Sequence, residues 1–292
     1  HDLRENSTPY TAREAAGYYL DRGGMLNVQS KRGCSYTCSY CSYPTIEGRT
    51  IRHRAPEEVA EEVMWLKDRF GARYLFFADS IFNDPEGKYL QVAEALIRKK
   101  NSLPWCAFFR PENLRTADLR LLKRAGLSAM ELGTDAAADA TLEGLRKNFG
   151  FSDVLRVHQR IVKEGIPCAH FIMFGGPKES RNSLLEGLSN IERLENCVVF
   201  GFVGIRILPG TDIFQRAVKE GIIDSEESLL SPLFYYSPLI SREETEQLVK
   251  SSFDTRLDRI YPCQEFNQLI GALHQWGHVG PLWDLLLKRG RV

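Results

Sequence analysis

Short apolar runs alternate with longer amphipathic segments from residue 25 to about residue 220. Six of these runs are rich in aromatic or branched side chains, as strands are: residues 25–30, 73–78, 105–110, 128–133, 168–174 and 198–208. A segment with helical periodicity follows each run. This alternation predicts an α/β fold with a parallel sheet, because parallel strands need a crossover connection between them.

Start and stop signals bound several of the predicted helices. Pro56 fits the first position of a helix, and Gly71 fits the position just after its end. We expect Thr116 to cap the helix after the third strand and Thr211 to cap the helix after the sixth. These signals agree with the apolar periodicity, so the two patterns support the same elements.

Six consecutive strand–helix units joined by right-handed crossovers can wrap into an incomplete barrel or lie as an open doubly wound sheet. We predict a partial (β/α)6 TIM-like barrel with a C-terminal helical extension. Residues 1–24 would form a lead-in segment, residues 25–222 the core, and residues 223–292 a mainly helical layer on the open side of the sheet. In such folds the chemistry lies at the carboxyl ends of the strands.

The net charge of the chain argues against nucleic acid and anionic membranes as partners. The chain has 38 Lys and Arg against 38 Asp and Glu, so no bulk positive field attracts nucleic acid or an anionic membrane. No apolar stretch approaches the roughly 20 residues that a membrane-spanning helix needs. The first residues show no apolar run behind a basic start, so we expect no secretory signal and a cytoplasmic protein.

Three of the seven cysteines crowd into one short segment. Cys34, Cys38 and Cys41 have the spacing C-x3-C-x2-C directly after the first predicted strand, and this pattern does not suit a disulfide framework. The other four cysteines lie in apolar surroundings and are predicted to be buried. Thiolates at the close spacing can converge on one centre, and soft sulfur ligands select zinc or an iron–sulfur cluster.

Two kinds of metal centre follow from this spacing. A structural zinc ion needs four protein ligands, and the nearest plausible fourth is His53, which stands between Arg52 and Arg54. Three cysteines on a [4Fe–4S] cluster would instead leave one iron free to bind a substrate. The first alternative is a zinc-stabilised binding protein without turnover, and the second is an enzyme.

The cysteine motif, with Tyr40 before its last cysteine and its place after the first of six strand–helix units, resembles the radical S-adenosylmethionine (SAM) superfamily over residues 25–220. The resemblance implies that Cys34, Cys38 and Cys41 bind a [4Fe–4S] cluster whose open iron takes the amino and carboxylate groups of SAM. An electron from the cluster then breaks the sulfonium, giving a 5′-deoxyadenosyl radical that abstracts hydrogen from a substrate. It also implies an external electron donor and a small-molecule or lipid-like substrate.

The resemblance further implies SAM contacts at the strand ends. The backbone of Tyr40 would lie near the adenine. Asp79 and Ser80 stand where many members carry a Gly-Gly-Glu-like turn that receives the methionine amino group, with helix capping as the alternative. Glu131 and Asp135, on the fourth strand, would hold ribose hydroxyls.

Two later strand ends also resemble the family. Gly175 begins a stretch that resembles the Gly-Gly-Pro-Gly-Glu turn of many members, although Lys178 stands where a glycine is usual. A glycine at this position permits either the close approach of a ligand or a tight turn. Arg206 and Leu208 lie on a strand that resembles the adenine-contacting strand. Arg206 needs an anionic partner there, which would be the SAM carboxylate, a substrate acid or Glu131.

Residues 44–49, 77–83 and 234–238 resemble the cobalamin-associated branch of the family. Members of that branch usually carry an upstream cobalamin domain with a D-x-H-x-x-G motif, and none of the six histidines has that context. We therefore predict that this chain binds the cluster and SAM, and that cobalamin, with methyl transfer or rearrangement, requires a domain outside it. Phe234, Tyr235 and Tyr236 would form the exposed footprint of that domain.

An RNA-modifying radical SAM enzyme is the alternative within the family. Arg49, Arg52 and Arg54 form a small basic patch that would suit RNA. The zero net charge favours the reading without nucleic acid.

Overall fold

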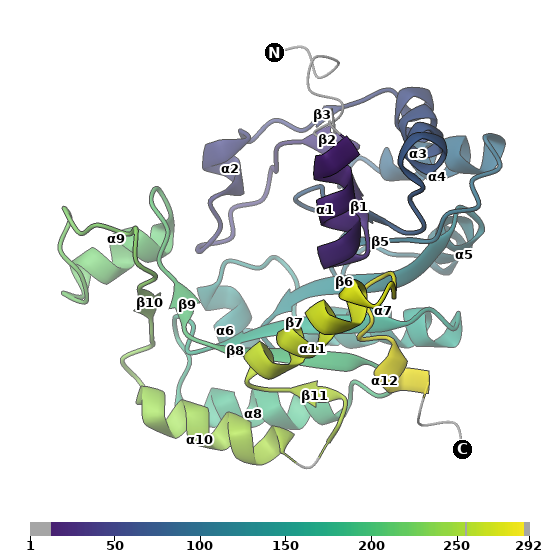
Figure 1. The fold of residues 1–292 in the computed structure, drawn as a ribbon. Coiled ribbons are helices and arrows are strands. Elements are labelled where there is room, and N and C mark those ends of the chain that lie inside the picture. Colours follow the sequence, from purple (N-terminus) through teal and green to yellow (C-terminus); the bar gives the residue numbers. More distant parts are fainter. Residues whose placement is uncertain (1–12, 255, 289–292) are drawn as a thin grey trace.

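The computed structural model describes residues 13–254 and 256–288, and its centre is a seven-stranded sheet in the order β1-β4-β5-β6-β7-β8-β11 (Figure 1). All neighbouring strands run parallel. The strands are β1 (Leu26–Val28), β4 (Leu75–Phe77), β5 (Trp105–Phe109), β6 (Leu127–Asp135), β7 (Cys168–Phe174), β8 (Val198–Val203) and β11 (Arg259–Ile260). The six predicted strands are all present and adjacent in chain order, as in a partial TIM-like barrel.

The last predicted strand, residues 198–208, is two strands instead of one. Gly204 has a φ of 94° between β8 and β9 (Ile205–Arg206), and a Cβ atom there would lie 2.9 Å from the ring of Tyr236. The turn at Gly204 directs β9 away from the main sheet to pair antiparallel with β10 (Phe234–Tyr235). The predicted helical extension also supplies β11, the edge strand beside β8.

Helices flank the sheet, and β2 (Lys31–Arg32) and β3 (Arg52–His53) form a small antiparallel pair outside it. The helices are α1 (Arg13–Gly23), α2 (Tyr43–Ile46), α3 (Pro56–Phe70), α4 (Tyr89–Arg98), α5 (Thr116–Arg124), α6 (Asp139–Gly144), α7 (Phe151–Lys163), α8 (Arg181–Glu192), α9 (Asp212–Lys219), α10 (Arg242–Phe253), α11 (Cys263–Gln275) and α12 (Leu285–Lys288). Within residues 13–254 and 256–288, none of the helices has both the length and the apolar character that crossing a membrane requires.

Most of the predicted helix boundaries are confirmed. Pro56 begins α3, and Gly71 follows its end with a φ of 68°. The Thr211 hydroxyl accepts the N–H of Phe214 at 3.2 Å and caps α9. The prediction for Thr116 is wrong by one residue, because the N-cap is Arg115 and Thr116 is the first helical residue. The Asp118 carboxylate accepts the backbone N–H of Arg115 at this helix start.

The two faces of the sheet have different partners. Side chains such as Leu75, Trp105 and Ile172 are fully buried in the larger core, which α3, α4, α5, α7 and α8 complete. On the opposite face, Cys106 and Ala169 pack against Trp283 and residues of α11 and α12, and Figure 1 shows α11 lying across the strands. The four solitary cysteines are buried and free, as predicted.

Candidate active site

Cys34, Cys38 and Cys41 line a single cavity of about 270 Å³, together with residues from the ends of several strands. Its other lining residues are Tyr36, Tyr40 and Tyr43 of the cysteine segment, Ser80 and Ile81 after β4, Phe108, Phe109 and Arg110 of β5 and its end, Gly133 and Asp135 of β6, Lys147, and Phe171 of β7. The carboxyl ends of parallel strands meet at one edge of the sheet, so this position agrees with the predicted place of the chemistry.

Backbone contacts hold the cysteine loop (residues 34–41) in place. Gly33 has a φ of 95°, and a Cβ atom at this position would lie 2.2 Å from the carbonyl oxygen of Thr50, so only glycine fits. The N–H of Cys34 donates to Gly48 O at 3.1 Å, and the N–H of Cys41 donates to Cys38 O at 3.2 Å. The loop conformation therefore does not depend on a bound metal alone.

The spread of the cysteines suits a polynuclear centre better than a single ion. Among the described residues, the group whose possible ligand atoms all lie within 4.8 Å of one another is His158, His170 and Cys197, not the three cysteines of the loop. Thiolates on one zinc ion would be about 4 Å apart, because each Zn–S bond is about 2.3 Å. Three thiolates that share a cavity at wider spacing match the donor set of an iron–sulfur cluster.

His53 lies elsewhere. It is on β3, with its Nε2 atom 3.7 Å from Glu86 Oε2, and it does not line the cavity. Burial lowers its pKa below the usual value. His53 is therefore not placed to be the fourth ligand that the zinc alternative assigned to it.

Tyr40 and Asp135, two predicted SAM residues, meet at one wall of the cavity. The Asp135 carboxylate accepts a hydrogen bond from Tyr40 Oη and forms an ion pair with Lys147, whose Nζ lies 3.3 Å from Tyr40 Oη. The side chain of Lys147 is 4% exposed, so its charge is held inside the site. Burial and the neighbouring Asp135 carboxylate raise the pKa of Tyr40 well above its usual value.

Ser80 lines the cavity, whereas its neighbour Asp79 does not. The Ser80 hydroxyl donates to Gly33 O at 3.2 Å. The buried Asp79 carboxylate accepts the N–H of Ser30 at 2.8 Å and pairs with Lys31 Nζ at 3.2 Å. These contacts give Asp79 an internal structural role that is not helix capping, and the expected role beside the SAM amino group stays a prediction.

Glu131 and Arg206 do not form the ion pair offered as one alternative. Glu131 is buried, and its Oε1 accepts the indole N–H of Trp283 at 3.1 Å. Arg206 is exposed on β9, in a different sheet. Neither residue lines the cavity, so the predicted contacts to ribose and to the SAM carboxylate remain predictions without geometric support.

Replacing Glu131 by Gln is expected to change how stability depends on pH. Burial raises the pKa of Glu131 to about 7 in the folded protein, whereas glutamate in an unfolded chain has a pKa of about 4.3. The stabilisation from this group is therefore complete below about pH 4 and is lost as the pH rises to about 7. The free energy of unfolding, measured with urea for both proteins, should fall between about pH 5 and about pH 7.5. This decrease should be smaller in the variant by on the order of 3 kcal/mol. Equal losses would contradict this expectation.

The predicted glycine turn and the end of β9 also lie outside the cavity. Gly175 has a φ of 86° and its N–H donates to the carboxylate of Glu179, while its carbonyl accepts the N–H of Ser237 at 2.9 Å. This arrangement favours the tight-turn interpretation of Gly175. The carbonyl of the half-buried Leu208 accepts the Thr211 hydroxyl at 2.7 Å, which places Leu208 beside the start of α9.

Several residues of the cavity were not predicted from the sequence. Arg110 is a charged residue at the carboxyl end of a predicted strand, and that position could have identified it. Lys147 is in the loop between α6 and α7, where no local pattern distinguishes it from a solvated lysine. Phe108 of β5 and Phe171 of β7 both line the cavity, and their rings pack edge to face with centroids 6.0 Å apart.

Comparison with known proteins supports the family resemblance that the cysteine motif indicated. The Radical SAM superfamily model matches residues 28–189. Tryptophan 2-C-methyltransferase of Streptomyces laurentii is 24% identical over 225 residues, which cover 70% of this chain and 37% of that protein. The anaerobic magnesium-protoporphyrin IX monomethyl ester cyclase of Synechocystis sp. is 32% identical over 132 residues, 44% of this chain and 26% of that protein.

Solved structures share the fold. The radical S-adenosylmethionine methyltransferase TsrM from Kitasatospora setae, solved with cobalamin and a [4Fe–4S] cluster, matches with a TM-score of 0.80 at 19% identity, over 94% of this chain and 61% of TsrM. The chain thus spans less than two thirds of the length of each of these three proteins. Because the family match covers more than half of its residues, the chain belongs to the radical SAM superfamily.

Proposed function

We propose that this chain is the SAM-cleaving core of a radical SAM methyltransferase that works with cobalamin. One observation carries the proposal: the three cysteines of the loop and the Tyr40–Asp135–Lys147 group line the same cavity. The first group suits a [4Fe–4S] cluster, and the second offers charges and hydroxyl partners of the kind that SAM carries. Membership of the radical SAM superfamily agrees with both.

The chain's own residues would bind SAM and exclude water from it. When bound, a [4Fe–4S] cluster supplies the electron that breaks the SAM sulfonium. Lys147 is a buried cation suited to the methionine carboxylate, and Asp135 is an acceptor suited to a ribose hydroxyl or the ammonium. Phe108 and Phe171 form an apolar wall that keeps water from a reactive carbon radical.

Cobalamin would come from a domain outside residues 1–292. The chain offers a second cavity, of about 600 Å³, beside β8 and α10, lined by aromatic side chains that include Phe202, Phe234, Tyr236 and Tyr261. Phe234 is 41% exposed, which supports part of the predicted footprint. The prediction for Tyr235 is wrong: its ring is fully buried, because it faces the core from β10.

The substrates named for two relatives support the inference about the substrate of this protein. The names of the two relatives identify tryptophan and a magnesium-porphyrin ester, both small organic molecules. We infer a small organic substrate for this protein, including lipid-like molecules, rather than RNA, because the chain has no net positive charge. An external one-electron donor would reduce the cluster.

Anaerobic reconstitution with iron, sulfide and hydroxocobalamin tests the proposal. With SAM labelled in its methyl group and a strong one-electron reductant, the protein should form 5′-deoxyadenosine, retain four irons and lose cobalt on desalting. Asp135→Asn should keep its iron and weaken SAM binding about tenfold, because a charge-assisted contact is lost. Isothermal titration of both proteins with SAM measures this difference.

Other results would contradict the proposal. A colourless protein that holds one zinc ion would return the chain to the class of binding proteins. Stoichiometric cobalt after desalting would show that the cobalamin site is within this chain. In a longer form of the protein that includes the cobalamin domain, absence of label transfer to cobalamin would reject methyl transfer.

A further inference from the structure

Arg110 brings a buried positive charge to one cysteine of the loop. It follows β5 directly and is 3% exposed. Its Nη1 lies 3.6 Å from Cys38 Sγ, which is within hydrogen-bonding distance because sulfur is larger than oxygen. Arginine keeps its charge throughout the accessible pH range, so the contact is an N–H···S bond from a permanent cation.

Neighbouring side chains hold the guanidinium in this orientation on every side. Its Nε donates to Glu112 and its Nη2 donates to Asn148 Oδ1. The ring of Tyr36 lies 3.7 Å from the guanidinium carbon, and the ring of Phe149 lies 5.0 Å away. A long, flexible side chain is thereby fixed in one position, which reduces the entropy lost when it donates to sulfur.

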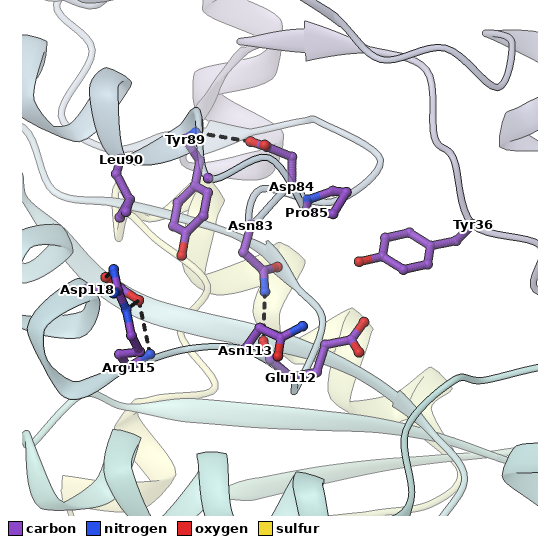
Figure 2. A pocket seen from close by; sticks show the side chains of 11 residues that line it. Tyr36, Asn83, Asp84, Pro85, Tyr89, Leu90, Glu112, Asn113, Arg115 and Asp118 are labelled. Carbon is purple, nitrogen blue, oxygen red and sulfur yellow. Dashed lines mark hydrogen bonds and ion pairs between the residues drawn. The ribbon is translucent and has the colours of Figure 1, made fainter.

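The backbone beside Arg110 is fixed as well. Asn83 Oδ1 accepts the N–H of Arg110 at 2.8 Å, and Asn83 Nδ2 donates to Arg110 O at 3.0 Å and to Glu112 O at 3.4 Å. Figure 2 shows Asn83 and Glu112 beside a smaller cavity that Tyr36 also lines. Arg110 and Glu112 thus form a rigid unit between that cavity and the cysteine loop.

We propose that Arg110 raises the reduction potential of the cluster that the cysteine loop binds, and that Glu112 limits the size of this effect. The inference rests on the proposed function, because it requires the cluster. A reduced cluster carries one more negative charge than an oxidised one, so a nearby cation favours reduction, and hydrogen bonds to the sulfurs act in the same direction. Glu112 opposes this effect because its carboxylate pairs with the same guanidinium.

The redox step is a single electron transfer. The electron would come from an external low-potential reductant, such as dithionite in the assay, and the bound cluster would gain one negative charge. No bond to Arg110 forms or breaks, and no proton moves, because the guanidinium stays protonated in both states. Arg110 is therefore a positioning residue, which acts on the potential through Cys38.

A redox titration followed by electron paramagnetic resonance tests the inference on the reconstituted protein without SAM. Arg110→Met should make reduction about tenfold less favourable, which lowers the midpoint potential by about 59 mV for one electron. Glu112→Gln should shift the potential in the opposite direction, because it removes the opposing charge. Arg110→Lys, which keeps the charge and loses the planar fork, should lie between Arg110→Met and the unmodified protein.

Arg115→Gln is the matched control. This arginine lines the same small cavity as Glu112, but its side chain is 74% exposed and pairs with Asp118, so its loss should leave the potential unchanged. Iron and sulfide are measured in every variant. If Arg110→Met fails to assemble a cluster, the upward shift in Glu112→Gln decides the question.

The outcomes separate this inference from the function on which it rests. A full cluster in all variants with equal potentials, or a shift of the same sign in Arg110→Met and Glu112→Gln, would overturn the inference and leave the proposed function standing. An unmodified protein that holds no iron–sulfur cluster would overturn both.

Discussion

Replacing Cys34, Cys38 and Cys41 together by alanine is expected to abolish iron binding and SAM cleavage and to leave the protein folded. The cysteine loop lies at the edge of the sheet, and its backbone is held by hydrogen bonds to Gly48 and within the loop itself. The larger core, by contrast, consists of strands and helices that do not involve these thiols. Iron and sulfide content, far-ultraviolet circular dichroism and 5′-deoxyadenosine formation measure the three parts of this prediction.

Cys106→Ala is the matched control for the triple variant. Cys106 is buried on β5 and packs in the smaller core, away from the cavity. Its loss should cost some stability and no iron. Reductive cleavage of SAM by the triple variant, or loss of the cluster in Cys106→Ala alone, would reject the assignment of the cluster to the cysteine loop.

Asp79→Asn is expected to reduce the free energy of unfolding by about 3 kcal/mol or more, because it removes one partner of a buried ion pair. Lys31 and Asp79 have side-chain exposures of 1% and 0%, and Lys31 Nζ also contacts Phe82 O at 2.7 Å. Without the carboxylate, the lysine charge would be left in the core with Asp84 3.7 Å away. Urea unfolding at neutral pH measures the loss.

A surface pair provides the comparison for Asp79. Glu244 pairs with Arg181 at 2.8 Å, and both side chains are at least 40% exposed, so Glu244→Gln should cost less than about 1 kcal/mol. SAM affinity of the folded Asp79→Asn protein should match that of the unmodified protein. A clear loss of affinity, with stability unchanged, would restore Asp79 to the predicted role beside the SAM amino group.

The strand–helix alternation was predictable because it depends on local periodicity. Each strand alternates toward two apolar layers or is buried on both faces, and each helix presents one apolar face, so the pattern recurs in the residues themselves. The division of residues 198–208 was not predictable, because it depends on Gly204 meeting the ring of Tyr236 from a distant segment. The same is true of β11, whose two residues form a strand only by pairing with β8.

The candidate site also has parts that could be predicted from the sequence and parts that could not. The cysteine loop is a local motif, and its place after the first strand predicted where the metal chemistry would lie. Tyr40 and Asp135 were predicted separately, but their mutual hydrogen bond and the part of Lys147 required the loop after α6 to pack against the cysteine loop. Asp79 resembled a ligand-binding residue by position, and only its contact with Lys31 revealed an internal partner.

The amino-acid sequence by itself determined the superfamily and the order of the elements, and it predicted the three cysteines of the cluster, since each depends on residues close together along the chain. Only the tertiary structure decided which polar strand-end residues line the cavity and which face the core. The partners of these side chains lie far away along the chain: Asp135 is 95 positions from Tyr40, and Arg110 is 72 positions from Cys38. Charge, burial and hydrogen bonding at such positions are properties of packing, so no local pattern carries them.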